Sequence, residues 1–95
     1  MATPPSWQLK QDIKRLIFDT LKISDVRPED VPDDASLFEN NPVLQLDSVD
    51  ALEIIVALQR KYSVHIDDRN LGRFIIRSVD SIAEFIEREN KNNQH

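Results

Sequence analysis

The sequence contains no cysteine among its 95 residues. This absence excludes a disulfide-stapled scaffold, a thiolate zinc site and a cysteine nucleophile. The only glycine is Gly72, and such scarcity disfavours tight hairpins and the glycine-rich loops that bind phosphate groups. The longest apolar run is Ile54 to Leu58, and five residues are too few to cross a membrane. Residues 1–5 lack the charged start and apolar stretch of a signal peptide, so we expect a soluble, cytoplasmic protein.

Basic residues are fewer than acidic ones, twelve against seventeen, and the net charge of −5 argues against a nucleic-acid partner. The imbalance is concentrated in residues 23–50, which hold eight acidic residues and one basic residue, Arg27. This segment is either a solvated acidic loop or a docking surface for basic partners, whose association it would speed. A chain of this length suits one domain, which we expect to span residues 6–90, with flexible ends at 1–5 and 91–95.

Three segments have the apolar spacing of helices, and a further short helix is predicted before the last of them, which together predict an all-α fold. The first is predicted over residues 6–21, with Ser6 as its N-cap. Its apolar stripe consists of Leu9, Ile13, Leu16, Ile17 and Leu21. The second is predicted over residues 48–62. A long loop over residues 23–46 separates the two, and we expect its apolar residues to anchor it to the core: Val26, Val31, Leu37, Phe38 and Leu44.

The second half of the chain is predicted to hold two more helices. A short one follows residue 67 or 68 and ends near Phe74. The last begins near Ser78 and ends near Glu89, unless Ser81 and Glu84 form a capping box that delays its start.

The predicted helix over residues 48–62 carries two apolar stripes about 120° apart. The first consists of Ala51, Ile55, Leu58 and Tyr62, with Ile54 at its edge. The second consists of Val49, Leu52 and Val56, and it is bordered by Asp47, Asp50 and Glu53. One stripe is enough to bury a helix in a small bundle, so the second is either a wider core contact or a recognition surface.

Ser48 lies on the first turn of this predicted helix, after Asp47 as the N-cap and before Asp50, which can support the cap. The serine is either an ordinary first-turn residue or the acceptor of a modification. The free N–H groups and the positive dipole end of a helix N-terminus suit a phosphate group.

The segment from Leu46 to Ile55, LDSVDALEII, resembles the phosphopantetheine attachment motif of acyl carrier proteins. The resemblance continues outside the motif, because residues 32–38 resemble the loop before the attachment helix, residues 62–66 the turn after it, and residues 78–86 the closing helix. The Asp-Ser-hydrophobic core is weakly specific alone, but in this order with these flanks the resemblance is strong.

The resemblance implies a small four-helix bundle with a long loop after the first helix and a short third helix. It implies that a phosphopantetheinyl transferase attaches the phosphopantetheine arm of coenzyme A to Ser48. The thiol of the arm would carry acyl groups as thioesters in fatty acid, polyketide or related specialised metabolism, and it would be the only thiol of a cysteine-free chain. The chain would then be a carrier and not an enzyme.

The resemblance also implies docking onto acyl-transferring and acyl-modifying enzymes with basic surfaces, and we expect the chain to act as a monomer. The partner-facing residues would be Asp47, Val49, Asp50, Leu52, Glu53 and Val56, while Ile54, Ile55, Leu58 and Tyr62 would face the core or an acyl pocket. A peptidyl or aminoacyl carrier of the same fold, or an unmodified helical adaptor that uses only its acidic and apolar surface, are the alternatives.

Three departures from the family pattern indicate a specialised carrier. Gln45 stands where a glycine is usual, and Val49 stands in place of the usual leucine after the serine. Gln59, Arg60 and Lys61 stand where the helix is usually acidic, which puts docking to the standard fatty-acid enzymes in doubt.

No catalytic or metal-binding constellation stands out in the sequence. The two histidines, His65 and His95, are thirty positions apart, and we expect His65 at the surface. Four aromatic residues are predicted to lie in the core: Trp7, Phe18, Phe74 and Phe85. Arg69, Arg73 and Arg77 recur at every fourth position, and they form either one basic helix face or ordinary solvated charges.

Overall fold

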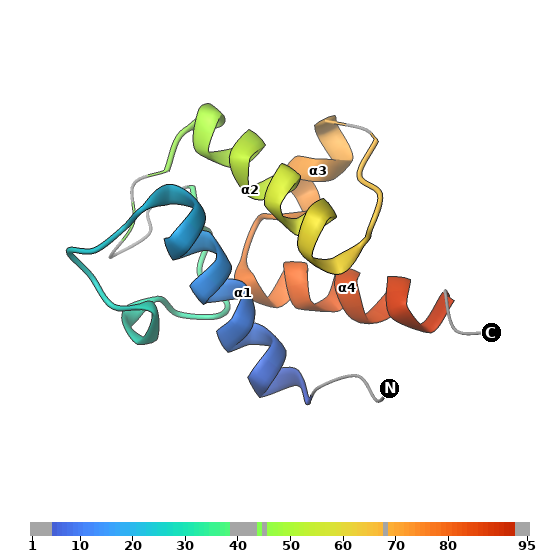
Figure 1. Cartoon of the computed structure of the whole chain (residues 1–95), viewed down its shortest axis with the longest axis horizontal. Helices are drawn as coiled ribbons and strands as arrows, with labels where there is room; N and C mark the ends of the chain where they lie inside the picture. The colour runs from blue at the N-terminus through green and yellow to red at the C-terminus, as the bar shows by residue number, and fades with distance from the viewer. Residues whose placement is uncertain (1–4, 39–43, 45, 68, 93–95) are drawn as a thin grey trace.

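The computed structural model describes residues 5–38, 44, 46–67 and 69–92. It consists of the helices α1 (Ser6–Leu21), α2 (Ser48–Tyr62), α3 (Arg69–Ile75) and α4 (Val79–Asn92), with a 3-10 turn over Pro28–Asp30 between α1 and α2 (Figure 1). The described residues contain no strand. The prediction of an all-α bundle with a long first loop and a short third helix is therefore confirmed.

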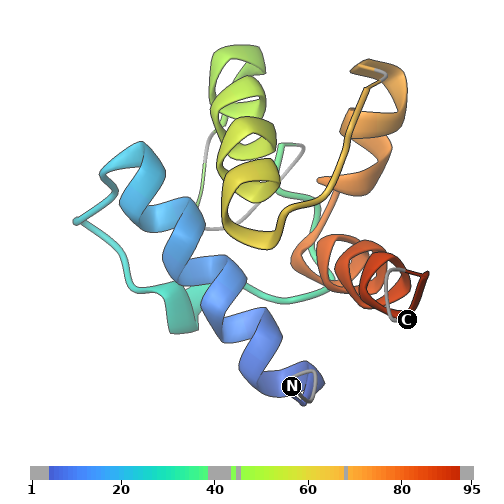
Figure 2. The same cartoon turned by 45° about the vertical axis from the view of Figure 1, so that its right-hand side comes forward.

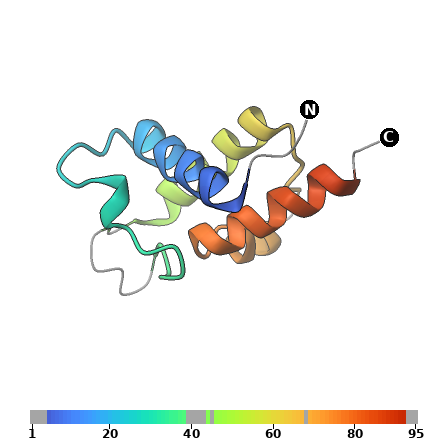
Figure 3. The ribbon, with the colours of Figure 1, turned by 90° about the horizontal axis from the view of Figure 1, so that it is seen from below.

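Helix α1 packs against α2, α4 and the 3-10 turn, whereas α3 packs against α4. Seen in Figure 2, α1 lies on one side of α2 and α3 lies on the other. Figure 3 shows the described part of the loop between α1 and α2 at one end of the molecule, opposite the C-terminal end of α4. The N-terminus of α2 thus lies away from the end where α4 finishes.

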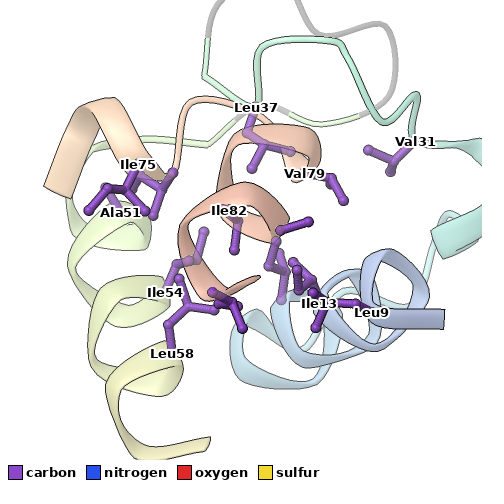
Figure 4. Close-up of a cluster of buried hydrophobic side chains, with 14 of the residues drawn as sticks. Leu9, Ile13, Val31, Leu37, Ala51, Ile54, Leu58, Ile75, Val79 and Ile82 are labelled. Carbon is purple, nitrogen blue, oxygen red and sulfur yellow. The ribbon is translucent and has the colours of Figure 1, made fainter. Parts of the chain in front are cut away.

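The core is mainly aliphatic and draws on all four helices and on the loop between α1 and α2 (Figure 4). Leu9, Ile13 and Ile17 of α1 are almost fully buried, as the predicted apolar stripe requires. They meet Leu58 of α2 and Ile82 of α4, both 0% exposed. The other buried members of this cluster are Phe18, Val31, Leu37, Leu44, Ala51, Ile54, Ile66, Ile75, Ile76, Val79, Ala83 and Ile86.

The described part of the loop between α1 and α2 is anchored to the helices. Val31, Leu37 and Leu44 are buried, and Val26 and Phe38 pack partly against the core, so the five predicted anchors are confirmed. Polar contacts add to this anchoring. Lys14 Nζ forms an ion pair with Asp33 Oδ1 at 2.6 Å. The backbone N–H of Asp80 donates a hydrogen bond to the Asp33 carbonyl at 2.9 Å.

The start of α1 differs from the prediction. The helix begins at Ser6, but Pro5 occupies the N-cap position and no side chain caps the helix. The Ser6 hydroxyl instead donates a hydrogen bond to Glu87 Oε1 at 2.9 Å, which joins the start of α1 to α4. The prediction of Ser6 as N-cap is wrong because the turn starts one residue earlier, where the Pro5 carbonyl accepts from the N–H groups of Gln8 and Leu9.

The start of α4 shows a reciprocal serine cap. The N–H of Ser81 donates to Ser78 Oγ at 3.1 Å, and the N–H of Ser78 donates to Ser81 Oγ at 2.9 Å. Ser81 thus takes the place that glutamate has in a usual capping box, so the alternative box at Ser81 and Glu84 is wrong. Helix α4 continues to Asn92, past the predicted end at Glu89.

The expected flexible ends fall mostly on residues 1–4 and 93–95, which lie outside the described residues, while Pro5 precedes α1 and residues 91–92 belong to α4. Two of the four aromatic predictions are wrong, because Trp7 is 62% exposed and Phe74 is 72% exposed. Trp7 lies on the first turn of α1, and two positions along a helix differ by about 200°, so it does not share the buried face of Leu9. Phe18 is buried and Phe85 packs partly against the core, as predicted.

Candidate functional site

The N-terminus of α2 is fixed by a capping box. The N–H of Asp50 donates to Asp47 Oδ1 at 3.0 Å, and the N–H of Asp47 donates to Asp50 Oδ2 at 3.1 Å. The predicted roles of Asp47 as N-cap and of Asp50 as its support are confirmed. The box holds Ser48 as the first residue of the helix, and the serine side chain is exposed. Its hydroxyl group is therefore open to an enzyme that would modify it.

Ser48 lies at the edge of a cavity of about 580 Å³, a size typical of sites for small molecules. The cavity is open to solvent and is lined by segments that are distant in the sequence: the loop between α1 and α2, the start of α2, and α3 with the turn after it. Its lining residues are Ser36, Phe38, Leu46, Asp47, Ser48, Ala51, Asn70, Arg73, Phe74, Ile76 and Arg77. Sequence reasoning missed the contribution of α3 to this cavity.

The arginine spacing indicated a basic helix face, but it did not show that this face lies beside Ser48. Arg73 lies in α3 and Arg77 lies just after its end, and both are exposed where they line the cavity beside Ser48. The side chain of Arg69 lies outside the described part of the structure. The two arginines are thus placed at the candidate site, and Phe74, expected in the core, forms part of the same wall.

The second apolar stripe of α2 faces solvent. Val49 is 63% exposed, Leu52 48% and Val56 46%, whereas Leu58 on the first stripe is fully buried. The idea that the second stripe is a wider core contact is therefore wrong. Glu53 is exposed beside the stripe. The remaining residues of the first stripe behave as predicted: Ala51 and Ile54 are buried, and Ile55 and Tyr62 pack partly against the core.

A groove of about 700 Å³ runs between α1 and the exposed stripe of α2. Leu16 and Thr20 of α1 line one side, and the α2 side consists of Leu52, Glu53, Val56, Ala57, Arg60 and Lys61. Charge changes sign along this helix face, from Glu53 to Arg60 and Lys61. Asymmetric charge of this kind fixes the orientation of a docked partner.

The three departures from the family pattern have different structural contexts. The Gln59 side chain has an internal role, because its Oε1 atom accepts a hydrogen bond from the N–H of Ile66 at 3.1 Å. Arg60 and Lys61 are exposed and available to a partner, as is Val49. Gln45 lies outside the described residues.

Tyr62 ends the buried side of α2. Its hydroxyl group is buried and has no hydrogen-bond partner among the described residues. Burial, with a smaller effect from the negative charge of Asp12, raises the pKa of Tyr62 to about 12. His65, in contrast, is exposed as predicted.

In the part of the chain that the structure describes, His, Asp and Glu side chains form no group of three that could hold a metal ion. The helices formed by these residues include none with the length and apolar character needed to span a bilayer.

Comparison with known proteins agrees with the resemblance seen in the motif. The family model described as "Phosphopantetheine attachment site" matches residues 11–86. Curated acyl carrier proteins from Chlamydia muridarum and Chlamydia trachomatis serovar D are 34% and 35% identical over 83 residues, which make up 86% of this chain and 97% of each relative. A curated acyl carrier protein from Buchnera aphidicola is 30% identical over 82 residues, which make up 86% of this chain and 92% of the relative.

The comparison with solved structures found no match. The family model alone covers more than half of the chain, and it includes α2 with the exposed serine at its start. The chain belongs to the family of acyl carrier proteins, which bear the phosphopantetheine attachment site.

Proposed function

We propose that Ser48 is the attachment point of phosphopantetheine and that the chain is a discrete carrier of acyl groups. The observation that carries this proposal is the exposed Ser48 hydroxyl on the first turn of α2, within the residues that the family model matches and beside a cavity. When bound, the arm supplies a thiol that holds acyl groups as thioesters. Because the sequence contains no cysteine, the arm would carry the only thiol of the loaded protein.

The attachment chemistry makes modest demands on the carrier. The Ser48 oxygen forms an ester bond with the phosphate next to the pantetheine of coenzyme A, its proton passes to the transferase, and adenosine 3′,5′-bisphosphate leaves. The contribution of this chain is to present the hydroxyl in a fixed position, which the Asp47–Asp50 capping box supports. The positive dipole end of α2 favours the negative charge of the resulting phosphodiester.

The same proposal assigns the exposed face of α2 to docking. Val49, Leu52 and Val56 would be the apolar anchors for a partner, and Asp47, Asp50 and Glu53 would attract basic residues around them. The partners are the phosphopantetheinyl transferase and enzymes that transfer or modify acyl groups, in fatty acid, polyketide or related metabolism. Arg60 and Lys61 at the far end would favour partners that place acidic residues there.

Intact-mass analysis tests the proposal. The chain is incubated with coenzyme A, magnesium and a broad-specificity phosphopantetheinyl transferase, beside Ser48→Ala and the matched control Ser24→Ala, which alters an exposed loop serine. We expect the native chain and the Ser24 variant to gain the mass of one phosphopantetheine, and Ser48→Ala to gain none while keeping its helical circular dichroism spectrum. Loading of Ser48→Ala would overturn the assignment, and no loading of the native chain by any transferase would favour an unmodified adaptor.

A further inference from the structure

The cavity beside Ser48 carries a charge opposite to that of the whole molecule. The chain has a net charge of −5. The cavity is lined by two positive residues, Arg73 and Arg77, and by one negative residue, Asp47, which leaves a local excess of one positive charge. A basic pocket next to the proposed attachment residue of an acidic carrier calls for a specific explanation.

The fold holds the two arginines at this place. Helix α3 approaches α2 closely at Gly72, where an added Cβ atom would lie 2.9 Å from Ile55 Cδ1 and 3.2 Å from Ile66 Cγ2. After α3, Ile76 is fully buried, and the carbonyl of Arg77 accepts a hydrogen bond from the N–H of Leu37 at 2.8 Å. The backbone on both sides of the basic pair is therefore fixed, while the side chains are free to reach into the cavity.

Within the described residues, no ion pair uses the guanidinium groups of the two arginines. Neither Arg73 nor Arg77 forms an ion pair with a described residue, whereas Lys10 and Lys14 of α1 pair with Asp80 and Asp33 at 2.8 and 2.6 Å. Asp47, the one carboxylate of the cavity lining, already uses one oxygen to accept the N–H of Asp50 in the capping box. The two arginines are thus available to an anion from outside the chain.

We propose that Arg73 and Arg77 form an anion-binding site that takes an oxyanion of the loaded arm and holds the arm against α3. Arginine suits this task because its planar fork of N–H groups binds phosphate and carboxylate oxygens in pairs. The exposed ring of Phe74 and the buried Ile76 give the cavity an apolar wall for the uncharged part of the arm. The inference rests on the proposed attachment at Ser48.

Two sources could supply the oxyanion. One is the phosphodiester that joins the arm to Ser48, which is present in every loaded form. The other is a carboxylate at the end of the carried acyl group, which is present only when the acyl group derives from a dicarboxylic acid. Three loaded forms separate them: the free-thiol arm, the butyryl arm and the succinyl arm, the last two having the same number of acyl carbons.

The test records the ¹⁵N–Hε signals of Arg73 and Arg77 in the apo chain and in the three loaded forms, after intact-mass analysis has shown complete loading. Shifts of both signals in all three forms, reduced by added salt, identify the phosphodiester as the anion. Shifts confined to the succinyl form identify the acyl carboxylate. No shift in any form, or a shift in the butyryl form alone, overturns the inference.

A second measurement uses the midpoint of urea unfolding. A loaded form that binds its own arm should unfold at higher urea than the apo chain. In the double variant Arg73→Gln/Arg77→Gln this difference should fall by at least half. In the control Arg15→Gln/Arg88→Gln, which removes the same charge from exposed positions on α1 and α4, it should persist. An equal loss in both variants would reveal a general charge effect and refute the site. Failure to load would instead count against the attachment at Ser48.

Discussion

The two leucines of α2, Leu52 and Leu58, differ strongly in burial and give a direct test of the two faces of this helix. Leu58 is 0% exposed in the centre of the core, whereas Leu52 is 48% exposed on the stripe assigned to partners. Replacement by alanine removes three carbons from each. At about 0.8 kcal/mol per buried CH₂, full burial corresponds to about 2.4 kcal/mol of transfer free energy. A cavity left in the core raises the total loss for Leu58→Ala to about 3–5 kcal/mol.

For Leu52→Ala, an exposure of 48% lowers the transfer contribution to about 1.2 kcal/mol, and no closed cavity forms. The free energy of unfolding of a chain of this size is about 5–14 kcal/mol, so only Leu58→Ala should bring the protein near the limit of stability. Urea unfolding followed by far-ultraviolet circular dichroism measures both losses. Fluorescence is a poorer probe, because the single tryptophan, Trp7, is already 62% exposed in the folded state.

The same two variants should separate in the opposite sense when docking is measured. Leu52→Ala should weaken the interaction with the phosphopantetheinyl transferase, which is measured as a rise in KM for the carrier. Leu58→Ala should leave KM unchanged under conditions where the variant is folded. Equal destabilisation at the two positions would refute the reasoning, because it would mean that the exposed stripe contributes to the core as much as the buried one.

Three further predictions concern single residues. Glu53→Lys should slow docking to a basic transferase in a salt-dependent manner, whereas Glu84→Lys, an equal charge change on α4, should not. Equal docking rates for the two variants at low salt would contradict the proposal that the acidic residues of α2 attract the transferase. Ultraviolet titration of Tyr62, the only tyrosine, should give a pKa of about 12 and not 10. Because the pKa is higher in the folded than in the unfolded chain, the contribution of Tyr62 to stability is complete below pH 10 and is lost from pH 10 to 12. A titration midpoint at pH 10 in the folded chain would show that the hydroxyl group is not buried. Gly72→Ala should change the free energy of unfolding by less than about 1 kcal/mol, because the atom that the added Cβ would meet at 2.9 Å, Ile55 Cδ1, is the movable end of a partly exposed side chain and the gain in helix propensity offsets the remaining crowding. A loss above about 2 kcal/mol in urea unfolding would contradict this.

The parts of the fold that sequence predicted well depend on local signals. Asp47 and Asp50 lie within one helical turn, so the start of α2 and its capping box could be predicted from their spacing. The two apolar stripes of the same helix could be predicted from the helical repeat of about 3.6 residues, and the different burial of the two stripes confirms that prediction. The loop anchors could be named because apolar residues in a polar loop have few other places to lie.

The parts that could not be predicted depend on contacts between distant segments. Ser36, Ser48 and Arg77 line one cavity but come from three separate parts of the chain, and the regular arginine spacing gave no indication of that neighbour. The exposure of Phe74 has the same origin, because its side of α3 is left uncovered at the cavity. At α4, Ser81 performs a task usual for glutamate, which residue preferences alone do not reveal.

The long loop between α1 and α2 has a consequence for the entropy of the unfolded chain. Residues 23–46 contain three prolines and no glycine, so this segment samples fewer backbone conformations when unfolded than a glycine-rich loop of equal length. Ordering it costs correspondingly less free energy, which lets a few buried residues and the Lys14–Asp33 pair hold its described part in place. Because Ser36 and Phe38 of this loop line the cavity beside Ser48, the stiffness of the unfolded loop helps to determine how well the candidate site is formed.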